Sequence, residues 1–402
     1  MNRRALLGQS ALLAVSTLFP SLAISQKRYG PGASDTEIRI GQTMAYSGPA
    51  SAYGTLGRSA AAYFAMVNAA GGVNGRRINM LSLDDGFSPP KTVEQTRRLV
   101  EQEEVLFMFN SLGTATNTAV QKYLNTKKVP QLFLGAGGAK FTDPANFPWT
   151  MGFQPNFFLE AKIFATYLRS VNPKARIGVL YQNDDLGKDY LSGLKQGLGD
   201  HGRTMIVGEQ SYELSDPTID SQLLALKSSG ADVFFSATTP KFAAQALRRI
   251  PQMDWKPLHL LTVGVLSVSA VLAQAGLENA IGAIGATYYK DPNDPQWAND
   301  PGLQQWREWM RSYYPAGDPG DSLNVLGYTF AETATQMLRQ CGDDLTRDNV
   351  MRQALNLDFQ PAMLLPGVRV KTGPTDYAPV SSMRLQRFDG KSWQLFGDLL
   401  TV

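Results

Sequence analysis

The chain has 402 residues, of which 43% are hydrophobic and 18% charged, a composition that is ordinary for a folded protein and excludes an intrinsically disordered one. A chain of this length exceeds what one hydrophobic core usually supports, so we expect two domains. Lys and Arg number 38 and Asp and Glu 35. This near balance, without a basic stripe, argues against nucleic acid as a partner.

The first 25 residues are typical of a cleavable secretory signal. Arg3 and Arg4 precede a short apolar run that ends in a small-x-small site, which predicts cleavage near Ser25/Gln26. Pro20 and nearby polar residues disfavour a retained anchor, since a spanning helix needs ~20 apolar residues. The arginine pair leaves the general secretory and twin-arginine routes both open. We therefore expect an exported, periplasmic protein.

The first half of the mature chain alternates between strand and helix patterns. Apolar residues repeat at helical spacing after the strand EIRIGQTM, and the helix stops at Gly71-Gly72. Such alternation predicts a parallel sheet covered by helices. The expected strands are 37–44, 78–85, 105–110 and 131–136, and the expected helices are 56–67, 91–104 and 117–125.

The same alternation restarts after NFPWTMGFQPN, a Pro, Gly and aromatic stretch that suits a crossing between domains. It predicts a second parallel sheet with strands at 176–184, 205–212, 232–238 and 258–264, and helices at 187–198, 219–227 and 241–250. A further strand is expected at 283–289, then helices with Trp306, Trp309 and Tyr313 at helical spacing. Asp389-Gly390 predicts a C-terminal hairpin with a two-residue turn.

Several strings that look catalytic fail on inspection. GAGGAK at 135–140 begins like a dinucleotide fingerprint, but Lys140 replaces its last glycine. The two histidines, in a loop and in a strand, have no nucleophile to serve, and Asp84 and Asp85 lack a third metal ligand. The single cysteine, Cys341, excludes an intramolecular disulfide. We therefore expect no catalytic residue, no metal and no cofactor.

The remaining signal is a set of strand-to-helix loops rich in small and hydroxyl residues. In open α/β sheets, ligands lie outside the carboxyl ends of the strands, where helix N-termini offer N–H groups. Two such domains facing each other would line a cleft, which indicates binding without chemistry. The loops are AYSGPASAYG, NSLGTATN, GAGGAK, NDDLGKDY, ATTPKF and TVGVLSVS.

Four stretches in order resemble the type I periplasmic solute-binding proteins of the branched-chain amino-acid class of ABC importers: YSGPASAYG, AAGGVNGRRI, LDDGFSPPKTVEQTRRLV and YQNDDLGKDYLSGLK. The resemblance runs over nearly all of the mature chain. It implies an α/β fold of two Rossmann-like lobes with parallel sheets, joined by three hinge crossings, that closes around a small ligand and delivers it to a membrane permease and ATPase. We place the crossings near Thr150, Ile281 and Gly367, so the N-lobe is 35–150 plus 283–366 and the C-lobe 151–282 plus 367–402.

In family members that bind amino acids, N-lobe loops hold the ligand carboxylate and an acidic C-lobe residue meets the ammonium. Here Gly113 and Gly137 stand where the resemblance implies hydroxyls, and Gly264 stands where it implies an acid. Because a buried ammonium without an anionic partner is costly, we expect an aromatic or other hydrophobic carboxylate. The alternatives are a branched-chain or other amino acid, with Asp185 meeting the amine, and a ligand-sensing regulator of the same fold.

The predicted site residues come from the loops of both lobes. Ser47, Ser111, Thr114 and the N–H groups of Gly113 and Ala136 are expected to hold the carboxylate. Aromatic rings near the loops are expected to face the apolar body of the ligand. The full predicted set is Tyr46, Ser47, Tyr53, Ser111, Gly113, Thr114, Gly135, Ala136, Gly137, Phe153, Asp185, Thr238 and Gly264.

Overall fold

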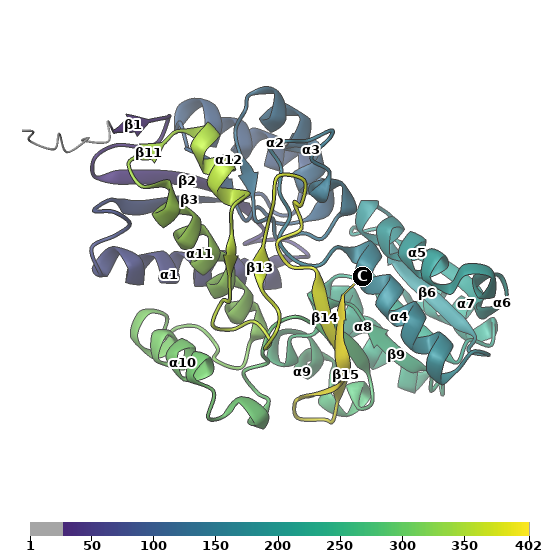
Figure 1. The fold of residues 1–402 in the computed structure, drawn as a ribbon. Helices are drawn as coiled ribbons and strands as arrows, with labels where there is room; N and C mark the ends of the chain where they lie inside the picture. Colours follow the sequence, from purple (N-terminus) through teal and green to yellow (C-terminus); the bar gives the residue numbers. More distant parts are fainter. Residues whose placement is uncertain (1–26, 402) are drawn as a thin grey trace, which may run out of the picture.

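A computed structural model describes residues 27–401, so the predicted signal segment lies outside the described residues. Figure 1 shows two α/β lobes side by side, with the chain passing between them more than once. One sheet has four strands in the order β3-β2-β4-β5, and the other has seven in the order β15-β14-β10-β9-β8-β6-β7. None of the helices between residues 27 and 401 is long and apolar enough to cross a bilayer.

The first lobe is built on the four-stranded sheet, whose strands are all parallel. Its long strand β2 buries six of its eight residues, which explains the apolar run in the sequence. Helix α1 packs against α11, which is buried along most of its length. The elements are β2 (Glu37–Met44), η1 (Ser51–Tyr53), α1 (Gly54–Ala69), β3 (Arg77–Asp84), α2 (Pro89–Arg97), β4 (Met108–Phe109), α3 (Thr114–Thr126), β5 (Gln131–Leu132), η3 (Ala139–Thr142), α10 (Pro301–Tyr313), α11 (Ser322–Cys341) and α12 (Arg347–Ala354).

The second lobe carries five parallel strands and an antiparallel pair at one edge. All five residues of β8 are buried, as expected for a central strand covered by helices on both faces. The elements are α4 (Phe157–Val171), β6 (Ile177–Gln182), α5 (Asp185–Leu198), α6 (Gly202–Met205), β7 (Ile206–Tyr212), α7 (Asp220–Ser228), β8 (Val233–Ala237), α8 (Pro240–Gln252), β9 (Leu258–Leu261), α9 (Ala273–Ala275), β10 (Ile284–Thr287), β14 (Ser382–Phe388) and β15 (Trp393–Thr401).

Three features differ from the sequence-based expectations. Strand β10 pairs with both β9 and β14, so residues 284–287 lie in the second lobe's sheet and the chain leaves that lobe after Thr287. Residues 370–371, as β13 (Val370–Lys371), pair with β12 (Asp358–Phe359) before the chain returns to the second sheet at β14. Residues 389–392 connect the two strands of the C-terminal hairpin, and because the Asp389 N–H donates to the carbonyl of Ser392, residues 390 and 391 lie at its tip, one position beyond the predicted pair.

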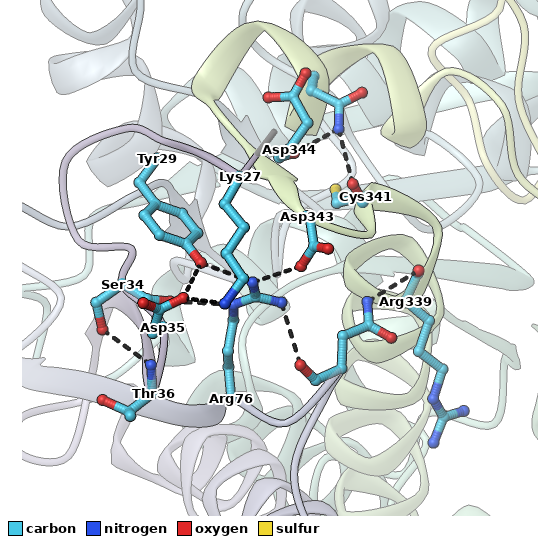
Figure 2. A network of polar contacts seen from close by, with 12 residues as sticks. Lys27, Tyr29, Ser34, Asp35, Thr36, Arg76, Arg339, Cys341, Asp343 and Asp344 are labelled. Carbon is cyan, nitrogen blue, oxygen red and sulfur yellow. Dashed lines mark hydrogen bonds and ion pairs between the residues drawn. The ribbon is translucent and has the colours of Figure 1, made fainter. Parts of the chain in front are cut away.

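The first described residues are fastened to the first lobe by a polar network (Figure 2). Strand β1 (Arg28–Tyr29) pairs in parallel with β11 (Asp344–Leu345). The guanidinium of Arg76, 2% exposed, donates from Nη2 to the Tyr29 hydroxyl at 2.8 Å and to Asp343 at 2.6 Å, and from Nε to a backbone carbonyl. A buried cation is tolerated here because it has several hydrogen-bonded partners, one of them a carboxylate.

Candidate functional site

A cavity of about 60 Å³ lies between the two lobes. None of the side chains that line it is charged; they are aliphatic or aromatic, or carry a hydroxyl or an amide. Such a mostly apolar surface with a few polar groups is typical of a small-molecule site. The first lobe contributes Tyr53, Leu56, Phe87, Leu112, Gly113, Thr114, Gly135, Ala136, Leu323, Leu326 and Phe330, and the crossing and second lobe contribute Gln154, Phe157, Leu186, Tyr190, Thr238, Thr239, Thr262, Val263 and Gly264.

The start of α3 forms the polar part of the first-lobe wall. Gly113 precedes the helix with φ of 92°, and a Cβ there would lie 2.4 Å from a ring carbon of Phe87, so this position requires glycine. Because the residue before the helix has no side chain, none caps the first N–H groups of α3. Thr114 is 1% exposed and its Oγ1 has no hydrogen-bond partner within the structure. This wall therefore presents an unpaired hydroxyl beside a helix N-terminus.

A buried carboxyl supports the opposite, second-lobe wall. Glu160 on α4 is 0% exposed; its Oε1 accepts the N–H of Val263 at 2.7 Å and its Oε2 accepts the Tyr190 hydroxyl at 2.6 Å. Burial raises the pKa of Glu160 to about 8 against the lowering effect of the Tyr190 and Val263 hydrogen bonds. Since Tyr190 and Val263 both line the cavity, Glu160 fixes two parts of its surface from behind.

Two aromatic rings form the apolar face of the second-lobe wall. Phe157, at the first turn of α4, stacks on Tyr190 with ring centroids 4.7 Å apart and planes 27° apart. Phe157 is 5% exposed and Tyr190 1% exposed. The side chain of Asn156 caps α4 by accepting the N–H of Leu159, and this cap fixes the turn that carries Phe157. The second-lobe wall therefore presents an aromatic face beside its hydroxyl side chains.

The lobes also touch directly around the cavity. The Tyr53 hydroxyl donates to the carbonyl of Gly264 at 3.0 Å, and a Cβ at Gly264 would lie 2.9 Å from that hydroxyl. Away from the cavity, Lys140 and Asp185 pair at 2.7 Å, and the N–H of Ala139 donates to Asp189 at 2.8 Å. These contacts hold the lobes in a closed arrangement.

Seven of the predicted site residues line the cavity and six do not. Among the six, the Tyr46 hydroxyl lies 2.6 Å from Ser82 Oγ, and Ser47 donates to Asp84 at 2.6 Å within the first lobe. The seven are Tyr53, Gly113, Thr114, Gly135, Ala136, Thr238 and Gly264.

The other four predicted residues lie near the cavity without lining it. Ser111 accepts the N–H of Thr43 at 3.2 Å, and Phe153 is a core residue whose ring packs on Phe330. Gly137 accepts the N–H of Phe157, and Asp185 is held in its ion pair with Lys140. Their partners within the protein explain why they do not face the open space.

Sequence reasoning missed the residues that α4 contributes, because this helix was not anticipated. Asn156 at the N-cap and apolar residues at 157, 161, 164, 165 and 168 are the signal that would have found it. Tyr190 was also missed, although its loop was singled out. Among residues 27–401, no three His, Cys, Asp or Glu side chains are grouped so as to hold a metal.

Comparisons with known proteins place the chain in a structural and sequence context. A family model for periplasmic binding proteins matches residues 37–392. "Leu/Ile/Val-binding protein homolog 7" of Brucella abortus (strain 2308) is 25% identical over 95% of this chain and 95% of its own length.

Solved structures give the same result for the fold. A branched-chain amino-acid ABC transporter protein from Thermus thermophilus with bound valine aligns with a TM-score of 0.83 at 16% identity, covering 92% of this chain and 98% of its own. A fatty acid ABC transporter substrate-binding protein from Thermomonospora curvata aligns with a TM-score of 0.79 at 20% identity, covering 94% and 95%. The predicted family and the two-lobed α/β fold class are confirmed.

Proposed function

This chain belongs to the periplasmic binding protein family, and on that premise we propose that it captures a small carboxylate with an aromatic or other hydrophobic body. It acts in the periplasm after signal cleavage near Ser25/Gln26, and it delivers the ligand to the permease and ATPase subunits of an ABC importer. It carries out no chemistry on the ligand. The observation that carries the proposal is the unpaired hydroxyl of Thr114 at the uncapped start of α3.

The start of α3 suits a carboxylate for two reasons. Helix N-termini carry partial positive charge and free N–H groups, and both favour an anion. A buried hydroxyl without a partner costs about 1–3 kcal/mol, so it calls for an explanation such as a missing ligand atom. A carboxylate oxygen at this point accepts a hydrogen bond from Thr114 and also supplies the anion that the uncapped N–H groups of α3 favour.

The electrostatics of the cavity disfavour an ammonium on the ligand. None of the cavity-lining side chains is charged. The nearby carboxyl of Glu160 already accepts a hydrogen bond at each oxygen, from Tyr190 and from Val263. An ammonium enclosed here would lack a free anionic partner, at a cost of several kcal/mol. The cavity therefore fits an acid without an amine better than an amino acid.

The size and lining of the cavity bear on the apolar part of the ligand. A volume of about 60 Å³ exceeds the ~10–15 Å³ that one water needs and is smaller than the ~150 Å³ cavity known to hold benzene. A compact aliphatic acid therefore needs the smallest adjustment, whereas an aromatic acid needs the lobes or the Phe157 ring to move outward. The similar fold of the fatty acid ABC transporter substrate-binding protein from Thermomonospora curvata is consistent with an apolar acid.

The competing function is capture of a branched-chain amino acid. It is favoured by the valine bound in the related Thermus structure and by the name of the Brucella relative. On that alternative, a carboxylate of this chain would have to turn toward the ligand ammonium. Asp185 would first have to leave Lys140.

A matched ligand series tests the proposal. 3-Methylbutanoate, 3-methylbutanamide and leucine share one branched body and differ in the charged groups; benzoate, benzamide and phenylalanine form a second, aromatic series. We expect the acids to raise the melting temperature more than the neutral amides or the amino acids do, since the stabilisation follows from affinity through mass action. Tight binding of leucine or valine with no response to the acids would overturn the proposal and restore the amino-acid alternative.

A further inference from the structure

Glu160 is the one feature of the cavity that capture of an acid leaves unexplained. Its carboxyl is fully buried and lies behind the cavity, where it accepts hydrogen bonds from two groups that line it, the Tyr190 hydroxyl at 2.6 Å and the Val263 N–H at 2.7 Å. A position that serves packing alone would be filled at lower cost by an apolar side chain at this depth. A carboxyl here makes the cavity sensitive to a proton.

No cation compensates a negative charge on Glu160. It takes part in none of the ion pairs formed between residues 27 and 401. The titratable groups that face it are tyrosines, Tyr190 from α5 and Tyr288 and Tyr289 from the segment just after β10, and burial raises the pKa of each far above neutrality. The surroundings of Glu160 therefore hold no charge at neutral pH, and its own ionisation is opposed by burial alone.

We propose that Glu160 is a positioning residue that links ligand capture to proton uptake, so that an acid binds to the form of the protein in which Glu160 is protonated. The inference rests on the proposed function, since it requires an anionic ligand. Two negative charges in one enclosed, poorly solvated space repel each other strongly. The proton comes from the buffer and resides on the Glu160 carboxyl, which then donates a hydrogen bond to the Tyr190 oxygen.

The same linkage selects against ligands that carry an ammonium. A protonated Glu160 offers a positively charged group no anion, so an amine enters only if Glu160 gives up its proton. Acids and amino acids should therefore shift the proton balance in opposite directions. The sign of the proton change on binding is a direct report of the ligand class.

Calorimetry in buffers of different ionisation enthalpy measures this proton change. The pKa of Glu160 in the free protein is about 8, so at pH 8 the binding of 3-methylbutanoate should take up about half a proton, and its affinity should fall about tenfold between pH 7 and pH 9. Glu160→Gln, which is neutral at every pH, should bind the acid without proton uptake and with an affinity independent of pH in this range.

Two further variants test whether the proton is taken up by Glu160 and not by another group. Tyr190→Phe removes a hydrogen bond that lowers the pKa of Glu160, so it should move the maximum of proton uptake to higher pH while the fold is kept. Glu332→Gln removes a second carboxyl whose pKa is raised by desolvation; it is partly buried, interacts electrostatically with Tyr63, Tyr328 and Arg339, and lines no part of the cavity. Proton uptake should persist in this control.

The outcomes separate this inference from the proposed function. Tight binding of 3-methylbutanoate or benzoate without proton uptake and with pH-independent affinity overturns the role of Glu160 and leaves acid capture standing. Failure of every acid to bind overturns the proposed function itself. Binding of valine with uptake of a proton overturns the role of Glu160, because the linkage requires an ammonium ligand to release one.

Discussion

The two walls of the cavity treat their polar groups in opposite ways. On the first-lobe wall, the Thr114 hydroxyl has no partner and the first N–H groups of α3 are uncapped. On the second-lobe wall, Tyr190, Thr238 and the N–H of Val263 all bond within their own lobe. Unpaired buried groups cost stability, whereas paired ones fix shape. The comparison suggests that the first lobe supplies binding energy and the second supplies the form of the cavity.

The largest expected effect falls on the wall that fixes shape. Phe157→Ala removes a ring that is 5% exposed and stacked on Tyr190, so the free energy of unfolding should fall by about 3–5 kcal/mol. Chemical denaturation of the unliganded protein measures it. Phe158→Ala is the matched control, because its ring is less buried and its loss should cost much less. Equal effects of the two would remove the structural distinction.

Thr114→Val tests the wall that awaits a ligand. The substitution replaces an unpaired hydroxyl by a methyl group of the same shape, so stability without ligand should be kept or raised, while the free energy of binding the acid should weaken by about 1.5–3 kcal/mol if a charged oxygen is bound there. Titration calorimetry measures the affinity. Thr116→Val should instead lower stability and leave affinity for the acid unchanged, since the buried Thr116 hydroxyl donates to the carbonyl of Leu112. Lost stability and retained affinity in Thr114→Val would contradict the comparison.

Glu160, behind the second-lobe wall, should also make the folded protein less stable at high pH. Glu160 has its pKa raised from 4.5 to about 8, so between these values the folded protein holds a proton that the unfolded chain has lost. The free energy of unfolding should therefore fall as pH rises, by about 1.4 kcal/mol per pH unit for this group, and level off above pH 8.

Urea unfolding from pH 5 to pH 9 measures this slope. Glu160→Gln should remove the contribution of Glu160 to the slope at every pH between the unfolded and folded pKa values of this group. Glu332, whose pKa is raised to about 7, provides a second case, and Glu332→Gln should remove a share that ends about one unit lower. A slope unaltered by Glu160→Gln would show that the carboxyl is not held protonated.

The smallest effect concerns the contact that joins the two walls. Tyr53→Phe deletes the hydrogen bond from its hydroxyl to the Gly264 carbonyl, which should speed ligand dissociation about two- to tenfold, in line with ~0.5–1.5 kcal/mol for one neutral hydrogen bond. Stopped-flow displacement measures it. Tyr46→Phe should leave the rate unchanged, because that hydroxyl bonds Ser82 within one lobe.

The fold was predictable because its strands are buried on both faces. Runs such as Val233–Ala237 are apolar at four of five positions and buried throughout, and their alternation with helical patterns indicates parallel sheets. Helix α4 was not predicted, because the Pro, Gly and aromatic stretch before it is typical of a crossing between domains and the next strong pattern is the strand that follows the helix. The pairing of β10 with β14 depends on residues about a hundred positions apart, which no local pattern encodes.

The site was predictable only as a set of loops. Gly113 and Thr114 stand at a strand-to-helix turn, where the topology of open sheets directs attention. Glu160 lies inside an apolar helix, and nothing in the spacing tells a buried carboxyl from a solvated one. The contact between Tyr53 and Gly264 joins residues 211 positions apart, so it required the relative placement of the lobes.

The polar network around Arg76 has a consequence for when the first lobe can fold during synthesis. Strand β1 and the Arg28 to Asp344 ion pair join residues 316 positions apart, so the first residues that the structure describes contact residues that are synthesised much later. Closing so long a loop is entropically expensive and slow. The first lobe therefore cannot be completed before Asp344 and Leu345 have been synthesised. A nascent chain that folds late stays extended longer, which is the condition in which a polypeptide threads through a narrow channel.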